Sequence, residues 1–444
     1  MAIVFDLSEE AEPPAITALL KDLKIPADYA RFEALGDASL FDELDRWKEH
    51  ALVSLRALRE LLSKRDGVDE DERADVVFAV APFRGEGEWT SEEMGELAET
   101  ILHLTGSLDV PFLEKLLMQY VKPVFQATPH PLLNTETGRK LPRAAGGPMA
   151  TQDVYEGQAW KAHPGIGNVL LWCVQHIESD AYERLWYLVV PPVMTLLDDY
   201  EAKYKLEGIL SVRALLVKAP PDLLRRTGVS ELLLSSIQRA LTFLHSPSTP
   251  KLIRAAVPTA IDLILRTTQK GSEQQFNQLC AILGEGIIGS VWMYGSQDAD
   301  AIEASVDSLP ELIKVLRIGT TRYLKALILQ LTHPLHPNPH RPARPSLQIS
   351  SLRALLCLIQ GCSPRMHAWK GTILESIAKC WVTLVDAAKA DPESLALKEG
   401  LRNTAVQLAF AAPSVLNNYA ALIARDEDMF GPLLGNLPAP KIEG

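Results

Sequence analysis

Apolar residues at helical spacing constrain the fold of this chain more than any other feature. They recur every three or four positions, the spacing at which side chains share one face of an α-helix. Between residues 166 and 420 the pattern returns in about a dozen segments of roughly 12 to 20 residues, joined mostly by short polar turns. Neighbouring segments pair into units of about 40 residues, which is the period of an α-solenoid. We therefore predict an all-α fold of stacked helix pairs.

Stretches rich in proline and glycine indicate how the chain is divided. Residues 128–165 have too few apolar side chains for a buried helix, so we expect a loop or linker there. This segment separates a less regular helical N-terminal region (1–127) from the solenoid (166–423), which a C-terminal tail (424–444) follows. The repeated prolines of 333–345 favour an extended arm that projects from the array. We predict no β-strand.

Four residues carry capping side chains at predicted helix starts. Thr90 and Asp180 each precede a glutamate by three positions, the spacing of a capping box. Thr249 and Asp391 each precede a proline, which is tolerated at the first helical position because its missing N–H has no partner there anyway. We predict that helices begin at these four residues.

The charge balance disfavours nucleic acid as a direct ligand. The chain has 44 Lys and Arg against 56 Asp and Glu, a net charge of −12. Such a chain repels phosphate backbones unless a local basic stripe overrides the net charge. We identify no such stripe and expect no direct contact with nucleic acid.

Cysteine content and hydropathy indicate a location inside the cell and away from the membrane. The five cysteines lack zinc-site spacing and suit buried free thiols in a reducing compartment. The N-terminus does not resemble a secretory signal. The longest apolar stretch, 185–197, is interrupted by Pro191 and Pro192 and is shorter than the roughly 20 residues that a bilayer requires. The cysteines are Cys173, Cys280, Cys357, Cys362 and Cys380.

A glycine pattern formally matches a dinucleotide-binding fingerprint. Gly284, Gly286 and Gly289 have the spacing G-x-G-x-x-G. That fingerprint requires a preceding strand and a helix that begins at the third glycine. Residues 276–283 instead have helical character, so we predict that these glycines form a turn that ends a helix.

Two further groups of polar residues are weak candidates for chemistry. His333, His336 and His340 lie between prolines without a nearby carboxylate or cysteine, so we expect a solvated loop and no metal. Cys173 and His176 are three positions apart, but their apolar neighbours predict a buried, unreactive thiol. Without a known catalytic motif or cofactor site, the chain is predicted to be no enzyme and to have no cofactor.

The segment 186–208 resembles a HEAT repeat. In that repeat a proline bends the first helix, an aspartate ends it, and a basic residue follows in the second helix. Pro191, Asp199 and Lys205 have this spacing. The signature as a whole comprises Pro191, Pro192, Asp198, Asp199 and Lys205.

Together with other motifs, this segment resembles the Tel-two-interacting protein two family. The likeness covers about residues 112–410. Its motifs are Lys122-Pro123-Val124-Phe125, Thr128-Pro129-His130-Pro131, Gly138-Arg139-Lys140, Trp160-Lys161, Trp369-Lys370 and Cys380-Trp381. Residues 1–100 resemble no family that we can name.

The resemblance implies a non-catalytic adaptor, the smallest subunit of the Triple-T (TTT) co-chaperone complex. Such a subunit binds two larger helical-repeat proteins and acts indirectly with heat-shock chaperone machinery. It supports the maturation and stability of phosphatidylinositol-kinase-related protein kinases, and thereby the DNA damage response and telomere maintenance. The implied location is the cytoplasm, with the nucleus as a second one. An alternative is a transport or trafficking solenoid of the importin or adaptin type, which would have ladders of inner-face Trp and Asn residues.

Two interpretations of the signature remain open. In the structural one, Asp199 caps the turn and Lys205 is its ion partner, each contributing about 1 kcal/mol. In the functional one, Lys203 and Tyr204 also face a partner protein. Tryptophans either anchor a partner or fill gaps between repeats. The tryptophans considered are Trp89, Trp160, Trp369 and Trp381, of which we select the last two as partner-binding candidates.

Overall fold

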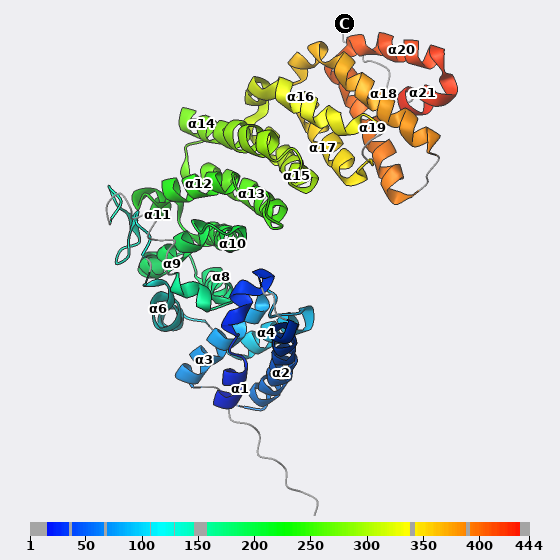
Figure 1. The fold of residues 1–444 in the computed structure, drawn as a ribbon. Helices are drawn as coiled ribbons and strands as arrows, with labels where there is room; N and C mark the ends of the chain where they lie inside the picture. The colour runs from blue at the N-terminus through cyan, green and yellow to red at the C-terminus, as the bar shows by residue number, and fades with distance from the viewer. Residues whose placement is uncertain are drawn as a thin grey trace, which may run out of the picture. The chain divides into compact units, whose positions relative to one another are not determined.

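Helices dominate the computed structural model (Figure 1). Among its described residues, the only β-structure is a two-stranded hairpin, so the predicted all-α class is confirmed. The chain divides into two compact units, unit 1 (Met1–Leu233) and unit 2 (Leu234–Gly444). The structure describes residues 16–34, 38–65, 69–106, 108–127, 129–145, 158–337, 342–387 and 391–435.

Unit 1 begins with helices of varied length that pack around aromatic side chains. The Tyr29 ring lies edge-on to Trp47 at 5.5 Å and to Trp89 at 6.3 Å, and its hydroxyl donates to the Leu44 carbonyl. Edge-to-face pairs of this kind stabilise beyond the area that they bury. The elements are α1 (Ile16–Asp22), η1 (Ala27–Ala34), α2 (Ala38–Ser63), α3 (Glu70–Val80), η2 (Ala81–Arg84), α4 (Glu92–Leu104), α5 (Val110–Leu116), η3 (Leu117–Val121) and α6 (Lys122–Phe125).

The rest of unit 1 contains regular helix pairs. Helix α10 packs against both α8 and α9, so that each helix buries one apolar face on its neighbours. The elements are η4 (Ala159–Ala162), α8 (Ile166–His176), α9 (Tyr182–Leu197), α10 (Ala202–Lys218), α11 (Pro221–Arg226) and α12 (Val229–Ala240), the last of which continues into unit 2.

A β-hairpin lies within the segment expected to be a loop. Strands β1 (Leu133–Asn134) and β2 (Arg139–Lys140) pair antiparallel, which corrects the prediction of no strand. The turn between them forms because Asn134 Oδ1 accepts two backbone N–H groups and Gly138 adopts a left-handed φ of 63°. Two-residue strands are too short to show apolar alternation, so the sequence pattern could not reveal them.

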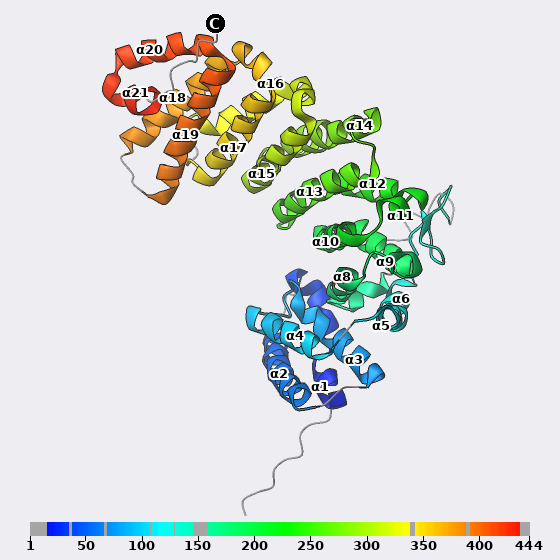
Figure 2. The same ribbon diagram turned by 180° about the vertical axis from the view of Figure 1, so that it is seen from behind.

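Unit 2 is a stack of helix pairs. Helices α13, α15, α17 and α19 pack successively against one another, and the two opposite views show them as one layer (Figures 1 and 2). The elements are α13 (Thr249–Thr267), α14 (Glu273–Ala281), η5 (Ile282–Trp292), α15 (Ala299–Leu316), η6 (Arg317–Tyr323), α16 (Leu324–Thr332), η7 (His333–Leu335), α17 (Pro345–Gly361), η8 (Ser363–Ala368), α18 (Lys370–Asp386), α19 (Pro392–Ala411), η9 (Pro413–Val415), α20 (Leu416–Arg425) and α21 (Glu427–Leu434).

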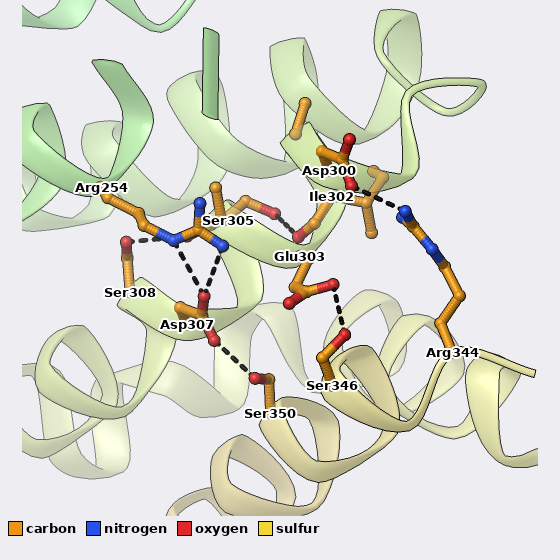
Figure 3. A network of polar contacts seen from close by, with 12 residues as sticks. Arg254, Asp300, Ile302, Glu303, Ser305, Asp307, Ser308, Arg344, Ser346 and Ser350 are labelled. Carbon is orange, nitrogen blue, oxygen red and sulfur yellow. Dashed lines mark hydrogen bonds and ion pairs between the residues drawn. The ribbon is translucent and has the colours of Figure 1, made fainter. Parts of the chain in front are cut away.

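A ladder of polar contacts links successive helices of this layer (Figure 3). The Arg254 guanidinium of α13 donates to one carboxylate oxygen of Asp307 on α15 at 2.9 Å. The other oxygen accepts from the Ser350 hydroxyl of α17 at 2.5 Å. Arg344 similarly reaches Asp300 at 2.8 Å. One carboxylate thus bridges three helices and helps to set their register.

The three glycines of the fingerprint-like pattern lie inside a helix. Gly284, Gly286 and Gly289 belong to the π-helical segment η5, so the predicted helix-ending turn is wrong. A Cβ on Gly284 would lie 2.7 Å from the Tyr323 hydroxyl, and one on Gly286 would lie 2.5 Å from a Leu241 methyl group. These glycines therefore allow neighbouring side chains to pack close to the helix backbone.

Of the four capping predictions, the one at Asp391 is confirmed. Asp391 accepts from the Ser394 N–H at 2.7 Å, as predicted. Helix α4 is capped instead by Ser91, one residue after the predicted Thr90. Helices α9 and α13 begin after Ala181 and Ser248, neither of which makes a side-chain cap, so the predictions at Asp180 and Thr249 are each displaced by one residue.

The C-terminal segment contains more helix than expected. Helix α21 lies within residues 424–444, the range that we assigned to a tail. In the part of the chain that the structure describes, no single helix has both the length and the apolar content to cross a membrane. Only α19 followed by η9 and α20 reaches that length and composition, and this pair is bent by 118°.

Candidate interaction site

The turn between α9 and α10 contains the repeat signature. Pro191 and Pro192 lie inside α9, which continues through them to Leu197. Asp198 and Asp199 follow directly at the turn. The two prolines therefore lie in the first helix and the two aspartates at the turn, in the order that the HEAT resemblance implies.

Asp199 is almost fully buried, and one of its carboxylate oxygens accepts two hydrogen bonds at the turn. Its Oδ1 atom accepts from the Glu201 N–H at 2.8 Å and from Lys161 Nζ at 3.0 Å. Lys161 also donates to Glu201 at 2.6 Å. Lys161 is thus the ion partner that the structure gives to Asp199, at a position that the structural interpretation did not consider.

Burial and charge act against each other in this ion pair. Burial raises the pKa of the Asp199 carboxyl above its usual value, and the Lys161 ammonium opposes that shift. Burial lowers the pKa of Lys161, but its contacts with Glu201 and Asp199 outweigh this effect and leave the pKa raised. Lys161 therefore stays charged, and its charge is needed by the buried carboxylate.

Asp198 has a separate partner from the preceding loop. His130 Nε2 lies 2.9 Å from Asp198 Oδ2, and the imidazole is buried. The Leu132 N–H donates to His130 Nδ1 at 3.2 Å, so the ring hydrogen is on Nε2 and points to the carboxylate. The adjacent Asp198 and Asp199 thus bind His130 and Lys161, which lie in two distant parts of the segment 128–165.

Several other motifs of the family resemblance contact α9, α10 or α12 of unit 1. The Trp160 ring stacks on Phe125 of α6 at 5.6 Å and meets Tyr204 of α10 edge-on at 4.7 Å. A Cβ on Gly138 of the hairpin would lie 2.9 Å from the Trp186 side chain of α9. Lys140 pairs with Glu231 of α12. Motifs far apart in the sequence therefore form one structural centre in unit 1.

The proposed basic residue of the signature, Lys205, is buried beside the turn. Its Nζ atom donates to the Leu197 carbonyl at 2.9 Å, near the C-terminal end of α9. A cation at this position satisfies a carbonyl that the helix leaves without an intrahelical partner. The close approach of α9 and α10 needs a glycine, because a Cβ on Gly208 would lie 2.5 Å from the Leu197 backbone nitrogen.

The partner-binding candidates lie in different surroundings. Lys203 Nζ donates to the Ala30 carbonyl of η1 at 3.0 Å and pairs with Glu201 at 3.3 Å. Tyr204 is half-buried against Trp160. Both therefore join elements within unit 1, and the structure leaves only part of each side chain for a partner.

The other two partner-binding candidates belong to unit 2. Trp369 is half-buried at the start of α18. Trp381 is only 2% exposed, and its indole N–H donates to the Met429 carbonyl at 2.8 Å. Because α21 covers Trp381, this side chain has no surface to offer a partner.

Two further tryptophans serve packing. Trp89 and Trp160 are 9% and 1% exposed, so of the two roles considered for them the gap-filling one describes their positions. Trp89 donates its indole N–H to the Pro82 carbonyl at 3.0 Å. Spacing in the sequence could not reveal this burial, because each ring is covered by elements distant along the chain.

The cysteine and histidine residues considered for catalysis or metal binding also make contacts within the fold. The Cys173 thiol is buried, which raises its pKa, and His176 Nδ1 contacts the Trp172 carbonyl. His336 contacts the Ser376 hydroxyl at 2.9 Å, while His340 lies outside the described residues. Across the described ranges, no three His, Cys, Asp or Glu side chains are grouped as metal ligands.

Comparison with known proteins gives a family match and a distant structural likeness. A sequence model of the Tti2 family matches residues 76–343, which is more than half of the chain. Among solved structures, the crystal structure of an engineered protein matches 94% of this chain and 97% of its own, with 13% identity and a TM-score of 0.37. The family match includes the whole α9–α10 centre.

Proposed function

Because the chain belongs to the Tti2 family, we propose that it is the adaptor subunit of the TTT co-chaperone complex. In this role it binds two larger helical-repeat subunits and supports the maturation and stability of phosphatidylinositol-kinase-related kinases, with heat-shock chaperones acting indirectly. The observation that carries the proposal is the family match across the centre formed by Asp198, Asp199 and their partners.

The geometry of this centre supports a non-catalytic role. Lys161, Asp199 and Lys205 each make close contacts inside unit 1, and those contacts join helices to loops. A catalytic group instead needs access to a substrate. We therefore propose a scaffold without enzymatic activity. From the family resemblance we further propose that it is located in the cytoplasm and also in the nucleus.

A stacked helical layer supports binding to other proteins. Each helix pair of unit 2 buries one side on its neighbours and leaves long outer faces for partners. The trafficking alternative has no comparable support. It requires surface ladders of Trp and Asn, whereas Trp160 and Trp381 are buried.

Affinity purification of the tagged full-length chain from its own cells, at moderate salt and with mass spectrometry, tests the proposal. We expect two large helical-repeat proteins in near-equal amounts and the giant kinases in smaller amounts. Failure to recover the two large subunits would count decisively against the TTT role. Recovery of cargo with nuclear signals, or of coat components, would favour the trafficking alternative.

A further inference from the structure

A long part of unit 2 contains no acidic residue. Between Glu311 and Glu375 there is no Asp or Glu, although the chain as a whole has a net charge of −12. The overall balance therefore conceals a local excess of positive charge. The nine cations in this stretch are Lys314, Arg317, Arg322, Lys325, Arg341, Arg344, Arg353, Arg365 and Lys370.

Four of these cations lie close along the chain, around the short connection between α15 and α16. Lys314, Arg317, Arg322 and Lys325 are all exposed. Within the described residues none of them forms an ion pair with a carboxylate. By contrast, Arg344 is neutralised by Asp300. The charge around η6 is therefore available to an external partner.

Favourable interaction with a helix dipole explains the positions of only some of these four cations. Lys314 and Arg317 lie at the C-terminal end of α15, where cations interact favourably with the helix dipole. Arg322 and Lys325 instead flank the start of α16, and the first turn of that helix has no acidic residue. Cations at a helix N-terminus oppose the dipole. Their presence there is a cost to local stability that an external anion would offset.

Apolar side chains are exposed beside the cations. Ile318 of η6 and Leu329 of α16 are 56% and 49% exposed. Phe276 of α14 lies against Gly319, where a Cβ would be 2.6 Å from its ring, and it is also exposed. Large exposed apolar side chains in a group often mark interaction surfaces. We define the η6 edge as Lys314, Arg317, Ile318, Arg322, Lys325 and Leu329.

We propose that the η6 edge binds an acidic segment of a partner protein that also carries apolar side chains. The carboxylates would pair with Arg317, Arg322 and Lys325, and the apolar side chains would cover Ile318 and Phe276. Two of the three exposed apolar residues, Ile318 and Leu329, are aliphatic. They favour a peptide over single-stranded nucleic acid, whose bases are bound mainly by aromatic stacking. The proposal concerns any such partner and does not depend on the TTT assignment.

Fluorescence anisotropy with the full-length chain tests this surface directly. The probe is a short labelled peptide of glutamate and leucine, compared with a lysine and leucine peptide and with single-stranded oligo-dT. We expect the acidic peptide alone to bind, and its affinity to fall as NaCl is raised. Charge reversal by Arg317→Glu, Arg322→Glu and Lys325→Glu together should weaken binding by roughly tenfold or more.

A matched variant distinguishes binding at the η6 edge from a general effect of the chain's net charge. Lys21→Glu, Arg59→Glu and Arg213→Glu together make the same charge change at exposed positions of unit 1. We expect this variant to bind the peptide as the native chain does, and Ile318→Ser to weaken binding with the charges intact. Thermal melts establish that each variant is folded.

Three results would overturn the proposal. The first is no binding of the acidic peptide by the native chain, and the second is equal weakening by the two charge-reversal variants. The third is tighter binding of oligo-dT than of the peptide with loss in the η6 variant, which would assign the edge to nucleic acid.

Discussion

At the residue scale, Lys161 is expected to contribute strongly to the stability of unit 1. Its side chain is only 15% exposed, and it pairs with Asp199, whose side chain is fully buried. Removal of one partner of a buried pair leaves an uncompensated charge, which costs several kcal/mol. We predict that Lys161→Met lowers the free energy of unfolding of unit 1 by about 3 kcal/mol in urea titrations.

Lys140→Met is the matched control for this prediction. Lys140 pairs with Glu231 across an exposed surface of the same unit. Methionine retains most of the aliphatic stem in both variants, so the comparison isolates the charge. The control should lose less than about 1 kcal/mol. Equal losses in the two variants would mean that Lys161 acts only as a surface residue.

At the element scale, the α9–α10 contact depends on a glycine. Gly208 lies so close to the α9 backbone that a Cβ would be 2.6 Å from Leu197 Cα, and the backbone cannot move aside without separating the helices. We predict that Gly208→Ala destabilises the chain by about 1–3 kcal/mol, measured by chemical denaturation. The normal preference of helices for alanine over glycine gives the opposite expectation.

Gly371 provides the comparison, because it is also helical but has open space around it. No atom lies within 4 Å of a Cβ placed there. Gly371→Ala should therefore stabilise by up to about 1 kcal/mol through helix propensity. If Gly208→Ala were also stabilising, the close packing of α9 and α10 would not constrain this position.

At the scale of the whole molecule, assembly is expected to contribute to stability. Each unit has its own core, and unit 2 leaves several large apolar side chains exposed. Partner binding to the native state stabilises it by mass action. We predict a lower melting temperature for the isolated chain than for the chain in its purified complex, measured by differential scanning fluorimetry. Equal melting temperatures would refute this coupling.

Among the predictions made from the sequence, the successful ones rest on local features. The helical class follows from spacing within a few residues, and the Asp391 cap needs only the adjacent proline and the amide of Ser394. The order of proline, aspartate and lysine in the signature is equally local. Even so, some helix starts were displaced by one residue, since several nearby side chains compete for the same capping position.

The tertiary structure decided which residues meet. Lys161 reaches Asp199 across 38 positions and His130 reaches Asp198 across 68, and no spacing rule connects residues so far apart. Burial of Trp381 depends likewise on a helix that begins 46 positions later. The sequence by itself determined the helices and the repeat signature, because both depend on neighbouring residues. Ion partners, buried tryptophans and the exposed η6 edge depend on how the helices pack.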